Sequence, residues 1–320
     1  MTMVLEVDRI RKFFNPMDTW FGKAGKPVRA VDEVTFSISK GESFALVGES
    51  GCGKSTVARC IAGLLNPDSG VMKVNGQDLV LMRKNDNRAA CRAVQMVFQD
   101  PYSSLNPRMT VGDAVAEPLL IDGLLSRIAI RKKVSELLAE VGLDSDAALK
   151  FPHEFSGGQR QRIGIARALA LEPSLLIADE PVSALDVSIQ SQILLLLQSL
   201  QKSRNLSLLF ITHDLAVVRN FCDRMAVMYL GRLVEQGKVE DLLGFPQHPY
   251  TVALRAAALL PDMSAKHSLT RSDGEMPSPV NPPAGCHFHP RCAVRLEQCQ
   301  NVDPVWIHKE MGHSIRCHLA

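Results

Sequence analysis

Short apolar runs alternate with segments of helical periodicity along most of this chain. The clearest apolar runs are residues 44–47, 175–178 and 208–212. Their length and uniform apolarity are typical of strands buried on both faces of a parallel sheet. Helical patterns occupy residues 56–65, 111–120, 131–141, 163–170, 188–201 and 249–260. The alternation predicts an α/β fold with a parallel sheet.

The first apolar run leads into a glycine-rich segment, here called the phosphate loop: Gly48-Glu49-Ser50-Gly51-Cys52-Gly53-Lys54-Ser55-Thr56. The segment fits the pattern G-x-x-x-x-G-K-[ST] and has the strand before it and the helix after it that this pattern requires. The glycines let backbone N–H groups converge on one anion, and the helix N-terminus adds partial positive charge. We therefore expect Lys54 to reach the β- and γ-phosphates of a nucleotide and Ser55 to bind Mg²⁺.

A second glycine-containing segment precedes the helical pattern at residues 163–170: Phe155-Ser156-Gly157-Gly158-Gln159-Arg160-Gln161-Arg162. The apolar run at residues 175–178 follows and ends in Asp179 and Glu180. Two carboxylates at that point lie at the C-terminal edge of a buried parallel strand, where open α/β sheets bind their ligands. Downstream of a phosphate loop, this pair indicates an NTPase.

Together these segments resemble the ATPases of ABC transporters, from Leu5 to about Gly244. The six elements of that family occur in order: Walker A at residues 48–56, the Q-loop glutamine Gln99, the signature motif at 155–159 with Phe155 in place of the commoner Leu, Walker B at 175–180, the D-loop at 183–186 and the switch histidine His213. The resemblance implies a P-loop NTPase core with a parallel sheet, an antiparallel N-terminal β part, a helical insert, and ATP and Mg²⁺ as ligands.

The family's catalytic roles transfer position by position. Asp179 would hold Mg²⁺ together with Ser55 and Gln99, and Glu180 would orient or deprotonate the attacking water. Lys54 and His213 would contact the γ-phosphate. A lone histidine after a strand is usually structural, but the order Thr212-His213-Asp214 after Asp186 favours the switch role.

Two sets of residues would contact ATP. The chain's own nucleotide would be bound by the whole phosphate loop, namely Gly48, Glu49, Ser50, Gly51, Cys52, Gly53, Lys54, Ser55 and Thr56, with Gln99. The nucleotide of a facing ATPase subunit would be contacted by Ser156, Gly157, Gly158, Gln159 and Asp186. Two ATP molecules would thus be sandwiched between two subunits, and hydrolysis would let the subunits separate.

An aromatic ring near the end of the first strand stacks on adenine in this family. Phe14 stands at the matching position. Phe13, Trp20 and Phe21 are alternatives, because residues 15–26 read as an inserted loop.

Composition narrows the possible partners. The chain has 320 residues and a net charge of +2, which gives no overall drive toward nucleic acid. No apolar run approaches the roughly 20 residues of a transmembrane helix. Residues 1–8 lack the charged and apolar regions of a signal peptide. We therefore expect a cytosolic chain that reaches the cytoplasmic face of the membrane through partner proteins.

The chain divides by pattern into three parts. Residues 1–98 and 157–245 form the predicted nucleotide-binding core, and residues 99–156 form a helical insert that carries the signature motif. Residues 246–320, here called the tail, are rich in proline and contain one predicted helix at 249–260.

Two segments resemble the ATPases of dipeptide and oligopeptide importers more specifically. One is the Q-loop, Val97-Phe98-Gln99-Asp100-Pro101-Tyr102-Ser103-Ser104-Leu105-Asn106-Pro107-Arg108, and the other is the tail, with Phe245-Pro246-Gln247-His248-Pro249-Tyr250-Thr251 and Gly285-Cys286-His287-Phe288-His289-Pro290-Arg291-Cys292. The resemblance implies peptide uptake with a second ATPase subunit, two permease subunits and a substrate-binding protein. Importers of nickel, glutathione or another small solute remain an alternative. The Q-loop and the tail argue against a soluble ABC ATPase of DNA repair or translation.

Four of the eight cysteines lie in the last 35 residues: Cys286, Cys292, Cys299 and Cys317. Their spacing is not the paired C-x-x-C of zinc ribbons, and disulfides are disfavoured in a cytosolic chain. Some importers of this subfamily hold a [4Fe–4S] cluster here, and four thiolates suit one. Zinc and no metal remain alternatives. Because the tail lies outside all six ATPase motifs, we expect it to serve structure or subunit docking.

Overall fold

The computed structural model describes residues 2–15, 25–259, 275–309 and 312–320. Two compact units divide the chain. Unit 1 comprises Met1–Leu5, Ile38–Gly41 and Lys73–Phe210, and unit 2 comprises Glu6–Ser37, Glu42–Met72 and Ile211–Ala320. In the described part of the chain, no helix has the length and apolar content needed to span a membrane.

Buried parallel strands organise unit 1. Strand β6 (Val94–Val97) pairs in parallel with β7 (Leu175–Asp179), and Val97 lies opposite Ala178. Strand β8 (Ser207–Thr212) follows β7 in the strand order. Every residue of β7 and β8 is buried, as their apolar sequences predicted. The C-terminal ends of β6 and β7 therefore lie at the same edge of the sheet.

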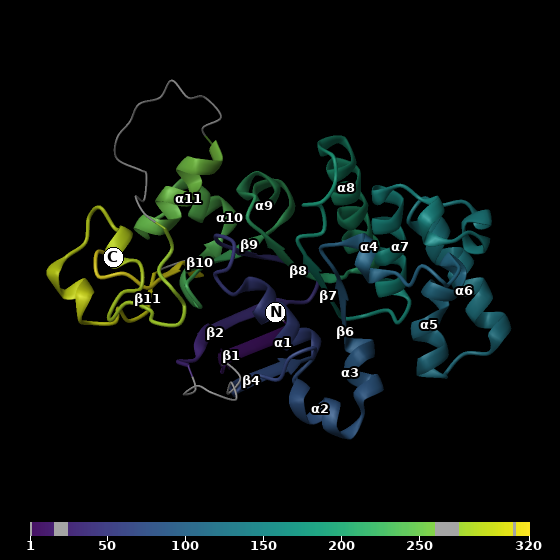
Figure 1. Cartoon of the computed structure of the whole chain (residues 1–320), viewed down its shortest axis with the longest axis horizontal. Helices are drawn as coiled ribbons and strands as arrows, with labels where there is room; N and C mark the ends of the chain where they lie inside the picture. The colour runs from purple at the N-terminus through teal and green to yellow at the C-terminus, as the bar shows by residue number, and fades with distance from the viewer. Residues whose placement is uncertain (1, 16–24, 260–274, 310–311) are drawn as a thin grey trace. The chain divides into compact units, whose positions relative to one another are not determined.

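The helices of unit 1 include the predicted helical insert. Helices α5, α6 and α7 pack against one another (Figure 1). The helical elements of this unit are α2 (Leu79–Asn85), α3 (Asn87–Ala93), α4 (Pro101–Ser104), α5 (Val111–Asp122), α6 (Arg127–Glu140), the 3₁₀ turns Ser145–Leu149 and Pro152–Glu154, α7 (Gly157–Leu169) and α8 (Val187–Arg204).

Two of these helices begin earlier than their apolar periodicity predicted. Helix α6 begins at Arg127 because the Ser126 side chain accepts a hydrogen bond from the Ala129 N–H. Helix α7 begins at Gly157 because Ser156 accepts one from the Gln159 N–H. In both cases the cap, rather than the first apolar residue, sets the helix start.

Unit 2 is built around its own set of strands. Strand β3 (Ser43–Val47) pairs in parallel with β9 (Arg224–Tyr229), which pairs antiparallel with β10 (Arg232–Lys238). The tail extends this sheet, since β12 (Ser314–Ile315) pairs with β10 and β11 (Ile307–His308) pairs with β12. The helical elements are α1 (Lys54–Ala62), α9 (Leu215–Phe221), α10 (Val239–Gly244), α11 (Pro249–Leu259) and the 3₁₀ turns His289–Arg291 and Glu297–Gln300.

A second sheet has the strand order β2-β1-β4-β5, formed by β1 (Met3–Phe14), β2 (Val28–Ser39), β4 (Ser69–Val74) and β5 (Gln77–Asp78). Its strands β4 and β5 run antiparallel. The chain thus has the predicted α/β class, with parallel and antiparallel pairs in the sheet that contains β3 and β6–β12, and antiparallel pairing of β4 and β5 in the other.

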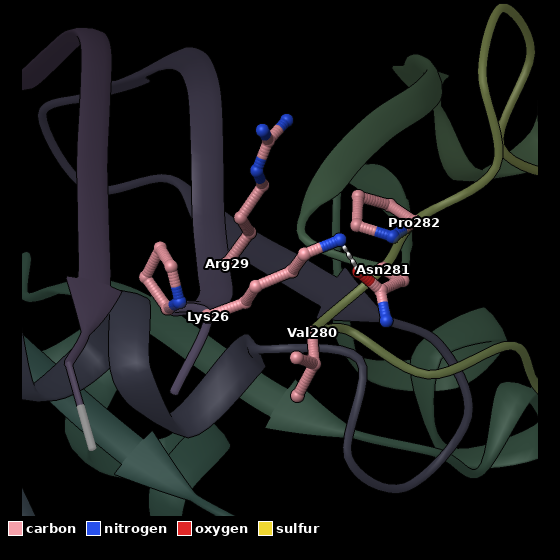
Figure 2. Close-up of a pocket in the computed structure, with 6 residues that line it drawn as sticks. Lys26, Arg29, Val280, Asn281 and Pro282 are labelled. Atoms are coloured by element: carbon pink, nitrogen blue, oxygen red, sulfur yellow. Dashed lines mark hydrogen bonds between the residues drawn. The ribbon is translucent and has the colours of Figure 1, made fainter. Parts of the chain in front are cut away.

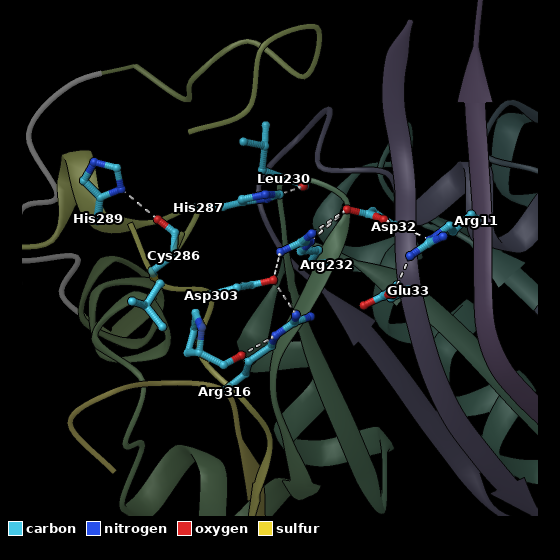
Figure 3. A network of polar contacts seen from close by, with 12 residues as sticks. Arg11, Asp32, Glu33, Leu230, Arg232, Cys286, His287, His289, Asp303 and Arg316 are labelled. Carbon is cyan, nitrogen blue, oxygen red and sulfur yellow. Dashed lines mark hydrogen bonds and ion pairs between the residues drawn. The ribbon is translucent and has the colours of Figure 1, made fainter. Parts of the chain in front are cut away.

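Ion pairs through Arg232 of β10 attach the tail to strand β2 in unit 2 (Figure 3). Arg232 contacts Asp32 of β2 at 2.7 Å and Asp303 of the tail at 2.7 Å. Arg316 contacts the same Asp303 at 2.9 Å. One carboxylate held by two guanidinium groups links two distant parts of the sequence, so the tail folds as part of unit 2.

Candidate nucleotide site

The phosphate loop of unit 2 is closely packed against neighbouring backbone. Gly51 and Gly53 have φ angles of 79° and 111°, which L side chains rarely adopt. A Cβ atom added to Gly53 would lie 2.1 Å from the Ala30 carbonyl oxygen, and one added to Gly48 would lie 2.2 Å from the Met228 carbonyl oxygen. Both approaches are far inside van der Waals contact, so the loop requires glycine at these positions.

Lys54 lies across the phosphate loop. Its side-chain ammonium donates hydrogen bonds to the carbonyl oxygens of Gly48 at 2.7 Å and Glu49 at 2.9 Å. Residue Lys54 is only 4% exposed and is the first residue of α1, whose N-cap Gly53 contributes no side-chain cap. Loop amides, a helix N-terminus and a buried ammonium group together form a cationic cradle suited to phosphate.

The acidic edge of unit 1 brings two predicted residues together. The Gln99 side-chain amide donates a hydrogen bond to Glu180 Oε2 at 2.9 Å. Asp179 ends the fully buried β7 and is itself buried. The next residue, Glu180, has a φ angle of 46°, an uncommon conformation for a non-glycine residue that is often associated with functional sites. Its carboxylate meets the Gln99 side chain through this hydrogen bond.

Helix α7 carries the signature motif at its N-terminus. Ser156 and Gln159 form a capping box, in which the Ser156 N–H donates to Gln159 Oε1 at 3.0 Å. The absence of a side chain at Gly158 leaves room for Ile189 of α8, since an added Cβ would lie 2.4 Å from Ile189 Cγ2. Asp186, the N-cap residue of α8, is exposed. The signature residues and the start of α8 are therefore in close contact within unit 1.

The Q-loop packs against the same signature helix. The Arg160 guanidinium lies 4.1 Å from the centre of the Tyr102 ring. Two turns further along α7, Arg167 donates a hydrogen bond to the Ser104 carbonyl oxygen at 2.6 Å. Burial lowers the pKa of Arg167. The segment after Gln99 and the helix after Ser156 are thus in direct contact.

The remaining predicted nucleotide contacts belong to unit 2. His213 follows β8 directly and is exposed, and Asp214 caps α9 by accepting the Ala216 N–H at 2.8 Å. Phe14 is the last residue of β1 and is 39% exposed, with the Lys12 ammonium 5.6 Å from its ring centre. Trp20 and Phe21, the alternatives for adenine stacking, lie outside the described residues, and Phe13 faces the Arg29 guanidinium at 5.8 Å.

The tail also contacts the start of β2, beside a hollow lined by Lys26, Pro27, Arg29, Val280, Asn281 and Pro282 (Figure 2). Lys26 donates to the Asn281 side-chain oxygen at 3.0 Å, and the Arg29 N–H donates to the Pro279 carbonyl oxygen at 3.0 Å. The next residue, Ala30, packs so closely against Gly53 of the phosphate loop that a side chain at residue 53 would strike its carbonyl oxygen. The tail is therefore bonded to strand β2, and the backbone of β2 packs against the phosphate loop at Gly53.

The four tail cysteines share one region of unit 2. The Cys286 N–H donates to the Cys299 carbonyl oxygen at 2.9 Å, and Cys299 and Cys317 are buried. Burial raises the pKa of Cys286 to about 11, and the thiols of Cys299, Cys317 and Cys292 act in the same direction. Within the described ranges, no three His, Cys, Asp or Glu side chains are grouped as ligands of a single metal ion.

Backbone amides point at three of these sulfur atoms. The thiol sulfurs of Cys286, Cys292 and Cys317 each accept a hydrogen bond from the N–H two residues later, contributed by Phe288, Val294 and Leu319 respectively. The Leu319 N–H lies 3.5 Å from the Cys317 sulfur. Burial raises the pKa of each of these three thiols, and the backbone hydrogen bonds offset part of that rise.

Sequence reasoning missed two residues that touch the phosphate loop. The side chain of Arg291 contacts Glu49 at 3.0 Å, and the Glu49 N–H donates to the Tyr250 hydroxyl oxygen at 2.9 Å. Both residues stand in tail segments that the sequence singled out only by resemblance. No spacing or periodicity relates them to a loop some 200 residues earlier. The tail lies outside the ATPase motifs in sequence, yet it contacts one of them in space.

Family models match two parts of the chain. The model described as "ABC transporter" matches residues 31–183, and the model described as "Oligopeptide/dipeptide transporter, C-terminal region" matches residues 234–299. The first match contains the phosphate loop, the Q-loop, the signature motif, Asp179 at the end of β7 and Glu180 after it. The second contains Tyr250 and three of the four tail cysteines.

Named relatives align over nearly the whole chain. The probable peptide ABC transporter ATP-binding protein y4tS of Sinorhizobium fredii is 49% identical, with 99% of this chain and 90% of that protein covered. The oligopeptide transport ATP-binding proteins OppF of Escherichia coli and AppF of Bacillus subtilis are 47% and 46% identical, with 98% and 99% of this chain and 96% and 97% of those proteins covered.

Solved structures agree with this relationship. A dimeric, post-hydrolysis state of the ATP-binding cassette MJ0796 bound to ADP and Pi has a TM-score of 0.63 and 28% identity, covering 73% of this chain and 98% of that one. CbiO1 of Clostridium perfringens, part of an ABC transporter complex, has a TM-score of 0.64 and 29% identity. The match covers 80% of this chain and 97% of that one. With a phosphate loop, an acidic sheet edge and a capped signature helix, the chain belongs to the ATP-binding proteins of the ABC transporter family.

Proposed function

We propose that this chain hydrolyses Mg-ATP to drive uptake of dipeptides or oligopeptides through separate permease subunits. The observation that carries the peptide assignment is the match of residues 234–299 to the C-terminal region of oligopeptide and dipeptide transporters. The names of the full-length relatives point the same way. The hydrolytic part is supported by the cradle around Lys54 and by the Gln99–Glu180 hydrogen bond.

The proposed roles follow from chemistry and position. Residues 48–56 bind the phosphates, Phe14 stacks on adenine, and Ser55, Gln99 and Asp179 hold Mg²⁺. Glu180 orients or deprotonates the attacking water, because its carboxylate follows the strand end and accepts a hydrogen bond from Gln99. His213 contacts the γ-phosphate. Mg²⁺ supplies charge neutralisation to the triphosphate.

We further propose that the chain works in an assembly at the cytoplasmic face of the membrane. A second ATPase subunit receives Ser156–Gln159 and Asp186 against its nucleotide, in line with the exposed N-terminus of α7 and the dimeric state of MJ0796. Two permease subunits and a substrate-binding protein complete the assembly. In this division of labour, residues 1–98 and 157–245 bind nucleotide, residues 99–156 communicate with the permease, and residues 246–320 form the tail.

The transport assignment is tested by reconstitution. The chain, its partner ATPase and the two permease subunits are placed in proteoliposomes with the substrate-binding protein, and accumulation of a labelled tripeptide is measured with and without ATP. We expect ATP-dependent accumulation that the Glu180→Gln variant lacks. ATP-dependent accumulation of nickel or glutathione, with no peptide signal, would replace the peptide assignment by one of these solutes.

For the tail we propose that Cys286, Cys292, Cys299 and Cys317 hold a [4Fe–4S] cluster. The donor set fits, because such a cluster takes four cysteine thiolates. Backbone N–H groups directed at three of the sulfurs lower the pKa of those thiols and offset part of the rise that burial causes. The four ligands of a cluster bind four different irons, so they surround a larger body than the ligands of one ion do. The lack of a single-ion site among the described residues is compatible with that arrangement.

The cluster proposal predicts colour and iron. Protein purified without oxygen should be brown and contain about four irons per chain, the content of a four-cysteine [4Fe–4S] site. Replacing Cys292 with Ser should remove the colour and lower the melting temperature. Replacing the exposed Cys91 with Ser is the matched control and should change neither. Colourless, iron-free protein from iron-replete anaerobic cells would refute the cluster, and stoichiometric zinc in it would assign zinc to the tail instead.

A further inference from the structure

Glu49 of the phosphate loop is held by the tail through both its side chain and its backbone. Arg291 makes a bidentate contact, with Nη1 at 3.0 Å from Oε2 and Nη2 at 3.2 Å from Oε1. The backbone N–H of Glu49 donates to the Tyr250 hydroxyl oxygen at 2.9 Å. All three residues belong to unit 2. Two separate tail segments therefore meet at one residue of the loop.

Glu49 also takes part in two hydrogen bonds within the phosphate loop. The Glu49 carbonyl oxygen accepts from the Lys54 ammonium at 2.9 Å and from the Cys52 N–H at 3.3 Å. The Gly48 carbonyl oxygen is the other acceptor of the Lys54 ammonium, at 2.7 Å. Fixing the Glu49 backbone therefore fixes one of the two acceptors that orient Lys54, the group that meets the phosphates. A displacement of Glu49 would be transmitted directly to that ammonium.

Arg291 is itself rigidly placed. Its side chain is 9% exposed, and its guanidinium lies 5.8 Å from the Tyr229 ring centre and 6.0 Å from that of Phe288. Those two rings pack edge-on at 5.2 Å, and Tyr250 packs edge-on against Tyr229 at 4.7 Å. Cation–π contact and aromatic packing restrict the guanidinium to the position in which it meets both Glu49 oxygens.

The Arg291–Glu49 contact also affects the charge that a bound nucleotide meets. A carboxylate in a loop that binds a triphosphate repels its ligand, and because the Glu49 side chain is 30% exposed, salt screens part of this repulsion. A planar guanidinium paired with both carboxylate oxygens neutralises that charge and also fixes its direction. The contact therefore removes an unfavourable charge while it holds the loop in shape.

We infer that Arg291 is a positioning residue for ATP binding, which acts through Glu49 by neutralising its carboxylate and fixing the backbone that orients Lys54. This inference rests on the proposed assignment of residues 48–56 as the ATP-binding loop. It makes the tail a functional part of the nucleotide site, not only a docking or structural extension.

The test measures the affinity of the full-length chain for Mg-AMP-PNP by calorimetry at low and high salt. Arg291→Gln should weaken binding about tenfold at low salt, and less at high salt, because an uncompensated Glu49 repels the phosphates. Glu49→Gln in the same chain should restore most of the lost affinity, since it removes that charge. Arg291→Lys should keep an affinity between the two, because it keeps the charge but not the bidentate geometry.

Arg316→Gln is the matched control. Arg316 is a similarly buried tail arginine, 11% exposed, and its partner Asp303 belongs to the tail rather than to the loop. We expect its affinity for the nucleotide to stay within about twofold of the parent's. A loss in Arg316→Gln equal to that in Arg291→Gln, or no recovery in the Glu49→Gln, Arg291→Gln double variant, would show a general loosening and overturn the inference.

Lys54→Ala separates this inference from the assignment it rests on. If Lys54→Ala abolishes binding while Arg291→Gln binds like the parent, the loop assignment stands and the role of Arg291 is refuted. If Lys54→Ala binds like the parent, the assignment of the loop is refuted, and the role of Arg291 with it.

Discussion

Glu180→Gln should bind ATP and fail to hydrolyse it. The amide cannot accept a proton from the attacking water, so loss of a general base predicts a fall of roughly 10²- to 10⁴-fold in turnover. The Gln99 side chain can still donate to the amide oxygen at residue 180, as it does to the carboxylate at 2.9 Å, so the sheet edge should keep its shape. Steady-state ATPase assays of the assembled transporter, with nucleotide affinity measured in parallel, check both parts.

Lys54→Ala provides the contrast for that experiment. Removing the buried ammonium takes away a direct phosphate contact, so nucleotide affinity itself should fall. The two variants should therefore fail at different steps, one at the chemical step and the other at binding. Hydrolysis by Glu180→Gln at the parental rate would exclude Glu180 as the general base.

Ser156→Arg should block ATP hydrolysis in the assembled transporter without weakening ATP binding by this chain alone. The Ser156 side chain is exposed at the N-terminus of α7, and a long arginine there would obstruct a nucleotide presented by a facing subunit. We expect at least a 100-fold loss of assembled ATPase activity, comparable to loss of a transition-state contact. Calorimetry on the isolated chain and ATPase assays on the complex check the two expectations.

Ser156→Ala is the control for the lost helix cap. Ser156 accepts the Gln159 N–H, and removal of such a cap costs about 1 kcal/mol of stability. Ser156→Ala should therefore lower the melting temperature as much as Ser156→Arg but reduce the ATPase activity much less. A binding defect confined to the Ser156→Arg chain itself would contradict the arrangement of two facing subunits.

The sequence by itself determined the chemically constrained parts of this protein. The glycines of the phosphate loop have positive φ angles, 79° at Gly51 and 111° at Gly53, so their spacing follows from local backbone geometry. The apolar runs at β7 and β8 predicted fully buried strands, and parallel pairing then carried Gln99 and Glu180 to one edge. Helix starts were less accurate, because the caps Ser126 and Ser156 precede the apolar pattern that predicted the helices.

Only the tertiary structure decided what the tail touches. Glu49 and Arg291 are 242 positions apart, and Glu49 and Tyr250 are 201 apart. A helix or a strand leaves a period in the sequence because neighbouring residues share one backbone geometry. A contact between distant segments leaves no such period, since it depends on the packing of Tyr229, Tyr250 and Phe288 and on ion pairs through Asp303. For that reason the sequence identified the phosphate loop, but only the folded chain revealed which residues hold it in place.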